Sequence, residues 1–252
     1  MQKGSVFISI AEPKKPLEKS RNNMTKLVSS RDRSAASNII VAVAIPAIIT
    51  LITFLTPMNC NAQVGEHTLE NNKNEFGAWA ASSLGLSAAA GGSRDRRIPL
   101  LIGLRYGRVL GAGRYAALEY TVDVVPVAVV SGPKGGFSNP GGVASPGGGR
   151  DYAYGAGVIP VGFKVFVAPQ HRIKPYLTVS SGPFYFTKQV PVPDSAQFNF
   201  LSTGGGGVQI YLSSRRAINI EYRIGHLSNA GVGNLNPGFN SSTIHAGFSV
   251  FR

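Results

Sequence analysis

The chain has 252 residues, of which only 15% are charged and 31 are glycine. Soluble domains usually carry about 25% charged residues, so this chain departs from the usual soluble composition without being uniformly apolar. The formal net charge of +13 fits an anionic partner, either nucleic acid or a phosphorylated lipid, and composition does not choose between them.

An apolar run preceded by basic residues marks the N-terminal part of the chain. Residues 39–56 carry no charge, and small residues at Cys60 and Ala62 follow them. Small residues at this spacing suit cleavage by signal peptidase, with Gln63 as the mature start. We therefore expect residues 1–62 to be an N-terminal extension with a cleaved signal peptide, and the protein to be exported.

Three alternatives remain open for this segment. The apolar run is nearly long enough to be a retained transmembrane anchor. Cys60 is a candidate lipoprotein cysteine, although the residues before it form a poor lipidation motif, and Met24 is a candidate start. Because Cys60 is the only cysteine and would leave with the signal peptide, the mature chain is expected to form no disulfide and no thiolate metal site.

Beyond residue 75 the chain shows repeated runs in which apolar and polar residues alternate, separated by clusters of Gly, Pro and Ser. The eight runs cover residues 76–86, 98–110, 114–130, 152–167, 174–187, 197–212, 215–228 and 241–251. An even number of runs of this length predicts an eight-stranded antiparallel transmembrane β-barrel. We expect residues 76–252 to form this barrel and residues 63–75 to be a periplasmic leader.

The alternation separates aliphatic from charged side chains. In the seventh run, Ile218, Ile220 and Tyr222 share one face, and Glu221 and Arg223 share the other. Eight strands leave an interior only wide enough for side chains, which disfavours a pore. We therefore expect the aliphatic face to point into lipid and the charges to pair inside. The charges expected inside are Glu119, Asp123, Lys164, Glu221 and Arg223.

The connections between the runs support the same fold. Short ones lie at 111–113, 169–172 and 213–214, and longer ones at 88–97, 131–151, 188–196 and 229–240. Outer-membrane barrels have short periplasmic turns and longer external loops. A soluble all-β sandwich is the alternative. The glycine run at 204–207 lacks the Lys-Ser/Thr of a phosphate-binding loop and lies in a strand, which indicates close backbone approach or a bend.

One of the four histidines is followed two positions later by a serine, as His226 and Ser228 at the end of the seventh run. Residues two apart in a strand project from one face with Cα atoms about 6.6 Å apart, so the imidazole can reach the hydroxyl. Parity puts both on the lipid-facing side, where a polar pair is costly and usually functional. His67 and His171 are expected to have no such role, and His245 to pack inside the barrel.

The segment YRIGHLSNAG at 222–231, followed by NPGFN at 236–240 and a final strand, resembles the outer-membrane lipid A 3-O-deacylase family (PagL, acyloxyacyl-hydrolase type). The resemblance covers about the last thirty residues. Elsewhere the chain agrees in strand count and order. The resemblance implies an eight-stranded barrel that hydrolyses the ester-linked acyl chain at position 3 of lipid A, with a Ser-His-Glu triad on the barrel exterior.

The resemblance implies Ser228 as the nucleophile, His226 as its general base, and Asn229 as a residue that helps to bind the oxyanion. The family's acid falls fourteen residues after the histidine, where this chain has Asn240. Parity in the last strand places Asn240 on the outward face beside His226. An amide can orient a histidine but cannot stabilise an imidazolium as a carboxylate does. Asn240 in place of the family's acid therefore bears on the activity of the site and not on where the site lies.

The reaction so implied is acyl transfer through an acyl-enzyme, and it requires neither a metal nor an organic cofactor. The expected partner is lipid A or lipopolysaccharide in a bacterial outer membrane. Basic loop residues such as Arg97, Lys134 and Arg150 either contact its phosphates or are ordinary solvated charges. Nucleic-acid binding is disfavoured because the motif faces lipid. The alternative function is a structural or lipopolysaccharide-binding barrel that kept the motif and lost its acid.

Overall fold

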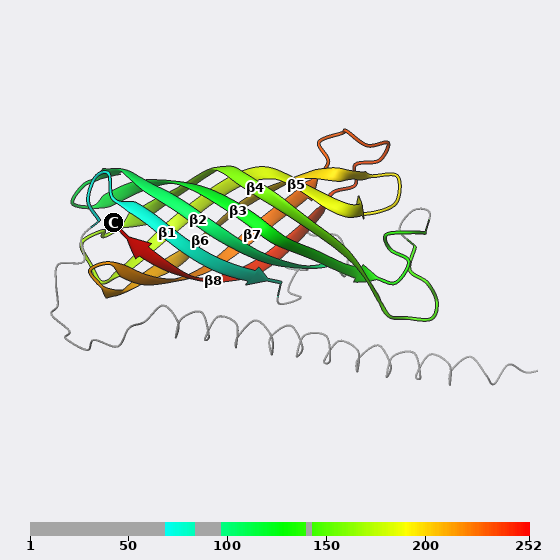
Figure 1. The fold of residues 1–252 in the computed structure, drawn as a ribbon, viewed down its shortest axis with the longest axis horizontal. Coiled ribbons are helices and arrows are strands. Elements are labelled where there is room, and N and C mark those ends of the chain that lie inside the picture. The colour runs from blue at the N-terminus through cyan, green and yellow to red at the C-terminus, as the bar shows by residue number, and fades with distance from the viewer. Residues whose placement is uncertain (1–68, 84–96, 140–142) are drawn as a thin grey trace, which may run out of the picture. The chain divides into compact units, whose positions relative to one another are not determined.

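A computed structural model describes residues 69–83, 97–139 and 143–252. Its eight antiparallel strands form a closed barrel in which β1 also pairs with β8 (Figure 1). The strands are β1 (Asn74–Ser82), β2 (Ile98–Ala112), β3 (Ala116–Pro133), β4 (Arg150–Val167), β5 (Ile173–Val190), β6 (Ala196–Ser213), β7 (Arg216–Ser228) and β8 (Phe239–Phe251). The predicted eight-stranded antiparallel barrel is confirmed.

The predicted signal peptide at 1–62 lies outside the described residues, as do residues 63–68 of the predicted leader at 63–75. β1 begins at Asn74, two residues before the barrel was expected to start. In the described part of the chain, no helix is long and apolar enough to cross a membrane.

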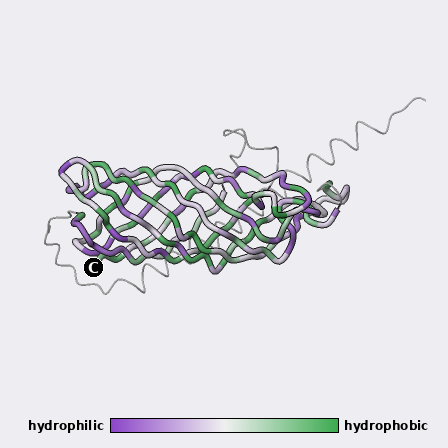
Figure 2. The backbone as a smooth tube through the Cα atoms, turned by 90° about the horizontal axis from the view of Figure 1, so that it is seen from above, coloured by the Kyte–Doolittle hydropathy of each residue, from purple (hydrophilic) through white to green (hydrophobic). Residues whose placement is uncertain are grey.

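The two faces of each strand differ in polarity. In β7, Ile220 is 47% exposed, whereas Glu221 and Arg223 are 4% and 1% exposed. Figure 2 shows hydrophilic and hydrophobic residues interleaved along the strands in this way. The barrel is therefore apolar outside and polar inside, which is the arrangement of a barrel that lies in a bilayer.

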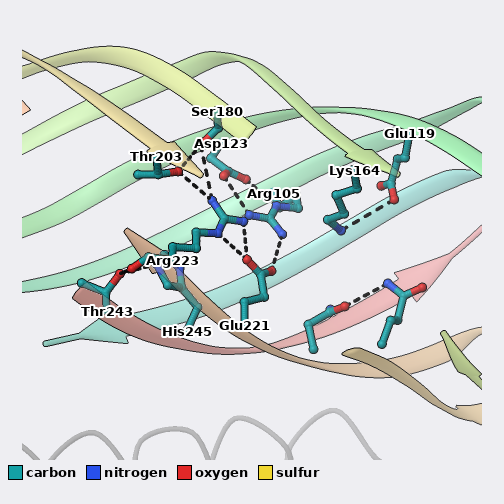
Figure 3. Close-up of polar contacts among 12 residues, drawn as sticks. Arg105, Glu119, Asp123, Lys164, Ser180, Thr203, Glu221, Arg223, Thr243 and His245 are labelled. Atoms are coloured by element: carbon teal, nitrogen blue, oxygen red, sulfur yellow. Dashed lines mark hydrogen bonds and ion pairs between the residues drawn. The ribbon is translucent and has the colours of Figure 1, made fainter. Parts of the chain in front are cut away.

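An ion network fills the middle of the barrel (Figure 3). Arg105 donates to both carboxylate oxygens of Asp123, at 2.7 and 3.0 Å, and to Glu221 at 3.1 Å. Arg223 pairs with the other carboxylate oxygen of Glu221, so each charge in the network has an opposite neighbour. The interior pairing predicted from the alternation is confirmed, with Arg105 as an additional member.

A second ion group and an apolar cluster close the turn end, where the β2–β3, β4–β5 and β6–β7 connections lie. Lys164 is 2.7 Å from Glu75 and 3.6 Å from Glu119. Leu69, just before β1, is 1% exposed, and its backbone N–H donates to the carbonyl of Pro169 at 3.1 Å. The cluster consists of Leu69, Val109, Ala117, Phe166, Tyr176, Tyr211, Ala217 and Phe251. The chain before β1 thus covers the turn end.

The opposite end, called the loop end here, holds the β1–β2, β3–β4, β5–β6 and β7–β8 connections. The expectation of a longer β5–β6 connection at 188–196 is wrong, because Val190 pairs with Ala196 and only residues 191–195 remain. Strand pairing continues past Lys188 and Gln189, whose polarity had suggested a loop. The β7–β8 loop, residues 229–238, is the connection that borders the candidate site.

The glycine run at 204–207 lies in β6, and its members point alternately to the inside and the outside of the barrel. A Cβ on Gly205 would collide with the carbonyl oxygen of Tyr222, so β6 and β7 approach closely there, as the sequence predicts. Gly204 instead points outward, where the nearest atom to an added Cβ is on Val179, at 3.9 Å. The outward glycines leave that part of the exterior without side chains.

Candidate active site

The candidate site lies on the exterior of β7 and β8, near the loop end. The strand register pairs His226 with Asn240. His226 is exposed, and its Nδ1 lies 2.6 Å from Asn240 Oδ1. The structure thus places Asn240 beside His226, where strand parity puts it.

This contact shows which ring nitrogen of His226 carries a hydrogen. An amide oxygen can only accept a hydrogen bond, so the Nδ1–H of His226 is the donor. A neutral ring with its proton on Nδ1 carries a lone pair on Nε2. The Asn240 oxygen therefore leaves Nε2 free to accept a proton.

A glycine supports the ring from the β7–β8 loop. Gly238 has a φ of +56°, a left-handed conformation that favours glycine. A Cβ added there would lie 2.8 Å from Cε1 and 3.1 Å from Nε2 of His226. The absence of a side chain at Gly238 lets the imidazole pack against the loop backbone.

Ser228 is the last residue of β7 and is half-buried on the same face as His226. Its partner in the register is Phe200 of β6. Within the described residues its hydroxyl makes no hydrogen bond, and so none to His226. The structure therefore brings His226 and Asn240 together and leaves Ser228 one strand repeat away, about 6.6 Å between Cα atoms.

Asn229 is fully buried and organises the loop that follows β7. Its Nδ2 donates to the Leu235 carbonyl at 2.8 Å, and its Oδ1 accepts from the Gly231 backbone N–H at 3.0 Å. The Asn229 backbone N–H donates to Asn236 Oδ1 at 3.1 Å. These bonds fix the chain between Ser228 and the glycine that supports His226.

Two serines complete a polar row that the sequence analysis missed. Ser202 of β6 is the register partner of His226, and Ser181 of β5 is the partner of Ser202. Their hydroxyl oxygens lie 2.8 Å apart, and the pair is exposed. The row Ser181–Ser202–His226–Asn240 therefore crosses four strands on the exterior. Polar residues at outward positions of two earlier runs were the available signal.

The remaining polar residues of interest lie elsewhere. His245 is 4% exposed inside the barrel, where its ring lies 5.1 Å from that of Trp79. Arg97 is 4% exposed and donates to the carbonyls of Gly136 and Pro191, so it joins loops and is not available at the surface. Arg150 donates to Ser131, whereas Lys134 is exposed. In the described ranges, no group of three or more His, Cys, Asp or Glu residues could hold a metal ion.

The site combines a histidine that Asn240 orients with a serine on the same face of β7. An oriented imidazole and a nearby serine hydroxyl are the two groups that acyl transfer requires. Both project from the apolar exterior of a barrel. Fold and site together define a transmembrane β-barrel that carries a histidine, an asparagine and a serine close together on its apolar exterior.

The sequence places this barrel in a family. A family model described as "Lipid A 3-O-deacylase (PagL)" matches residues 114–249, which is more than half of the chain. The match includes His226, Ser228, Asn229 and Asn240. The chain belongs to the lipid A 3-O-deacylase (PagL) family.

Solved barrels are similar in fold. The outer membrane enzyme PagL is 16% identical with a TM-score of 0.44, over 69% of this chain and 97% of that one. The outer membrane protein OprG from Pseudomonas aeruginosa is 10% identical with a TM-score of 0.43, over 75% and 99%. The attachment invasion locus protein Ail of Yersinia pestis is 8% identical with a TM-score of 0.39, over 73% and 100%. Among curated proteins, none matches this chain significantly.

Proposed function

We propose that this protein is a lipid A 3-O-deacylase that hydrolyses an ester-linked acyl chain of lipopolysaccharide by a serine–histidine mechanism. The observation that carries the proposal is the 2.6 Å contact between His226 Nδ1 and Asn240 Oδ1 on the exterior of a barrel of this family. It supplies an oriented base on the face that lipid reaches, two residues from a serine.

The first half of the reaction forms an acyl-enzyme. A rotation of the Ser228 side chain brings Oγ to Nε2 while His226 keeps its bond to Asn240, and Nε2 takes the hydroxyl proton. Oγ attacks the ester carbonyl carbon and forms a tetrahedral intermediate with a negatively charged oxygen. When that intermediate collapses, the bond to the sugar oxygen breaks and His226 returns its proton to that oxygen. The deacylated lipid A then leaves.

The second half releases the acyl chain as a fatty acid. His226 takes a proton from water, the resulting hydroxide attacks the acyl-enzyme, and Ser228 Oγ recovers the proton. We assign Asn229 to oxyanion binding. One Nδ2 hydrogen is engaged by the Leu235 carbonyl, and the second is the donor that would reach the oxyanion after a local movement of the loop.

Asn240 sets the expected rate. Replacing the acid of a protease triad by Asn costs about 10⁴-fold because the amide holds the wrong histidine tautomer. Here the amide oxygen faces Nδ1, so the useful tautomer is kept. The carboxylate charge that would stabilise the imidazolium is still missing, and we therefore propose a slow enzyme.

The proposed location is the bacterial outer membrane, with the site at the depth of the outer leaflet. His226 and Ser228 lie at the loop end, which in outer-membrane barrels is the external end. Export with cleavage near Ala62 belongs to the same proposal. Intact mass of the protein from membrane fractions tests it: a mature chain that begins near Gln63 is expected, and a retained 39–56 segment contradicts it.

Mass spectrometry of lipid A tests the activity. Cells that express the protein are expected to lose one acyl chain from lipid A, and cells that express Ser228→Ala are expected to keep it. The variant must migrate as a folded, heat-modifiable barrel for the comparison to hold. Unchanged lipid A in both strains favours the alternative, a structural or lipopolysaccharide-binding barrel that kept the motif.

A further inference from the structure

A groove on the barrel exterior lies near the turn end, away from the candidate active site. It runs over β1 and β8, which lie side by side in Figure 1, and has a volume of about 430 Å³. Its lining residues are Phe76, Gly77, Ala78, Phe248, Val250 and Arg252. The register pairs Phe76 with Val250 and Ala78 with Phe248, so the lining is apolar along both strands. The groove ends at an arginine.

An aromatic pair marks the depth of the groove in the bilayer. The rings of Phe76 and Tyr106 lie 5.5 Å apart, and the Tyr106 hydroxyl donates to Asn74 Oδ1 at 2.9 Å. Outer-membrane barrels carry girdles of aromatic residues where the hydrocarbon meets the headgroups. Outward residues level with Asn74 therefore lie at headgroup depth, and the groove extends from there toward the hydrocarbon.

Three arginines lie at this headgroup level. Arg108 is the register partner of Asn74 on one side. Arg252 adjoins Asn74 on the other side through backbone hydrogen bonds of 2.8 and 2.9 Å. Arg216 is the register partner of Val250 and is therefore diagonal to Arg252. Diagonal residues in neighbouring antiparallel strands are about 7–8 Å apart, a distance that two arginine side chains can close around one phosphate.

Two of these guanidinium groups are available to a ligand. In the part of the chain that the structure describes, the side chains of Arg216 and Arg252 make no hydrogen bond or ion pair, whereas Arg108 donates to Asn72 Oδ1 at 3.1 Å. Arg252 is exposed and Arg216 is partly exposed. The planar fork of an arginine matches the oxygens of a phosphate. The end of the groove thus offers two such forks to one anion.

The turn end as a whole is basic. Its arginines with exposed or partly exposed side chains are Arg108, Arg114, Arg172, Arg215, Arg216 and Arg252. Among the described residues, Glu70 is the acidic side chain exposed at this end, because Glu75 and Glu119 are buried beside Lys164. An excess of positive charge attracts anionic lipid headgroups. Together with the apolar groove, it suits a molecule with an anionic head and an apolar tail.

The turn end of an outer-membrane barrel faces the periplasm, so headgroups at this depth belong to the inner, glycerophospholipid leaflet. We propose that the β1–β8 groove binds an anionic glycerophospholipid, with an acyl chain along Phe76 and Phe248 and the phosphate on Arg216 and Arg252. A free phosphate would leave the apolar lining unused, and a neutral lipid would leave the arginines unused. The proposal rests on the membrane location given above and not on hydrolysis.

Lipid binding to the purified protein in a neutral detergent tests the proposal without any turnover. The probes are dioleoyl phosphatidylglycerol and dioleoyl phosphatidylcholine, whose affinities are measured by native mass spectrometry. A basic residue at a membrane surface changes the binding of anionic lipid about fivefold, so we expect two arginines to favour phosphatidylglycerol by about twenty-five-fold. Arg216→Gln and Arg252→Gln should each lower this preference about fivefold, and the double variant should abolish it.

The matched control removes the same charge elsewhere at the turn end. Arg172 lies in the β4–β5 connection, on the opposite side of the closed barrel. Arg172→Gln is expected to leave the preference for phosphatidylglycerol unchanged in a barrel that still migrates as folded. Equal affinities of the two lipids for the wild-type protein overturn the proposal. Equal losses in Arg172→Gln and Arg252→Gln also overturn it, because the lipid would then respond to the charge of the whole end.

A second pair of variants tests the place of the acyl chain. Ala78→Phe adds a ring inside the groove and is expected to lower the affinity for both lipids alike. Ala156→Phe adds the same ring at an exposed position of β4 and is expected to change neither affinity. Equal effects of the two variants would mean that the chain does not lie in the groove, and would overturn the proposal.

Two further results would identify another occupant. Glycerol 3-phosphate, which carries the anion without the chains, is expected not to displace phosphatidylglycerol at equal concentration. Displacement would make the arginines a site for free phosphate and overturn the proposal. The same spectra report the oligomeric state. A dimer that retains no lipid and is weakened by Ala78→Phe would make a second copy of this chain the occupant, and would equally overturn it.

Discussion

Two groups of polar side chains lie on opposite faces of the same strands, one inside the barrel and one outside. They differ in how many of their hydrogen-bonding atoms have a partner. Inside, Ser180 and Thr203 adjoin Arg223, which pairs with Glu221 in a network with opposite charges throughout. Outside, the row Ser181–Ser202–His226–Asn240 ends in a free Nε2 and unused hydroxyl capacity. The interior group pairs within itself and stabilises the barrel. The exterior row keeps hydrogen-bond donors and acceptors that are free to contact a ligand.

The largest expected effect is on the deacylation rate, when Ser228 or His226 on the barrel exterior is replaced. Ser228→Ala and His226→Ala should each lower deacylation by at least about 10³-fold, and the double variant should lose little more, because nucleophile and base act as a unit. Release of fatty acid from purified lipopolysaccharide measures the loss. Unchanged heat-modifiable migration shows that the barrel stays folded. Full activity in either variant would remove the assignment.

Removing a charge from the interior ion network is expected to lower the stability of the barrel. Arg105→Met leaves Asp123 without its cation, whereas Glu221 keeps Arg223, and breaking a buried pair costs about 3–5 kcal/mol. Urea unfolding from phospholipid vesicles gives the free energy of unfolding. Lys188→Met removes a partly exposed pair with Asp151 and should cost less than about 1 kcal/mol. Equal losses in the two variants would mean that the interior network is not what stabilises the barrel.

A charge on the apolar exterior sharpens the assignment of faces. Ile220 lies in the middle of β7 and Leu110 near the turn end of β2, and both are exposed. Ile220→Arg should cost about 2–4 kcal/mol at the bilayer midplane, and Leu110→Arg about 0–1 near its edge. The same unfolding measurement applies. A larger cost for Leu110→Arg than for Ile220→Arg would contradict the depths in the bilayer that we assign to the two positions.

The smallest expected effect comes from the amide of the exterior row. Asn240→Ala removes the acceptor of the His226 Nδ1–H, and a hydrogen bond contributes about 0.5–1.5 kcal/mol, so the deacylation rate should fall about twofold to tenfold. Asn240→Glu should raise the rate, because a carboxylate also stabilises the imidazolium. An unchanged rate in Asn240→Ala would place the third member of the site elsewhere.

Period-two alternation was enough to predict the eight strands, the interior charges and the outward face that Asn240 shares with His226. These depend only on which face a residue occupies. The Ser181–Ser202 pair could not be predicted in the same way, because it depends on the register between β5 and β6. The short β5–β6 connection was missed because β5 continues through the polar residues Lys188 and Gln189 as far as Val190. The burial of Arg97 depends on loop carbonyls that no periodicity describes.

The closed interior has an electrical consequence. Leu69 and its apolar neighbours cover the turn end, and salt bridges fill the middle. Toward the loop end, the described residues leave a cavity of about 30 Å³ beside Phe184, Leu201 and Leu227, enough for about two water molecules. Among the described residues, the apolar cluster and the salt bridges leave a hydrated ion no continuous wet path along the axis. Planar bilayers that contain the barrel should remain insulating, so the protein adds no leak to the membrane whose lipid we propose it trims.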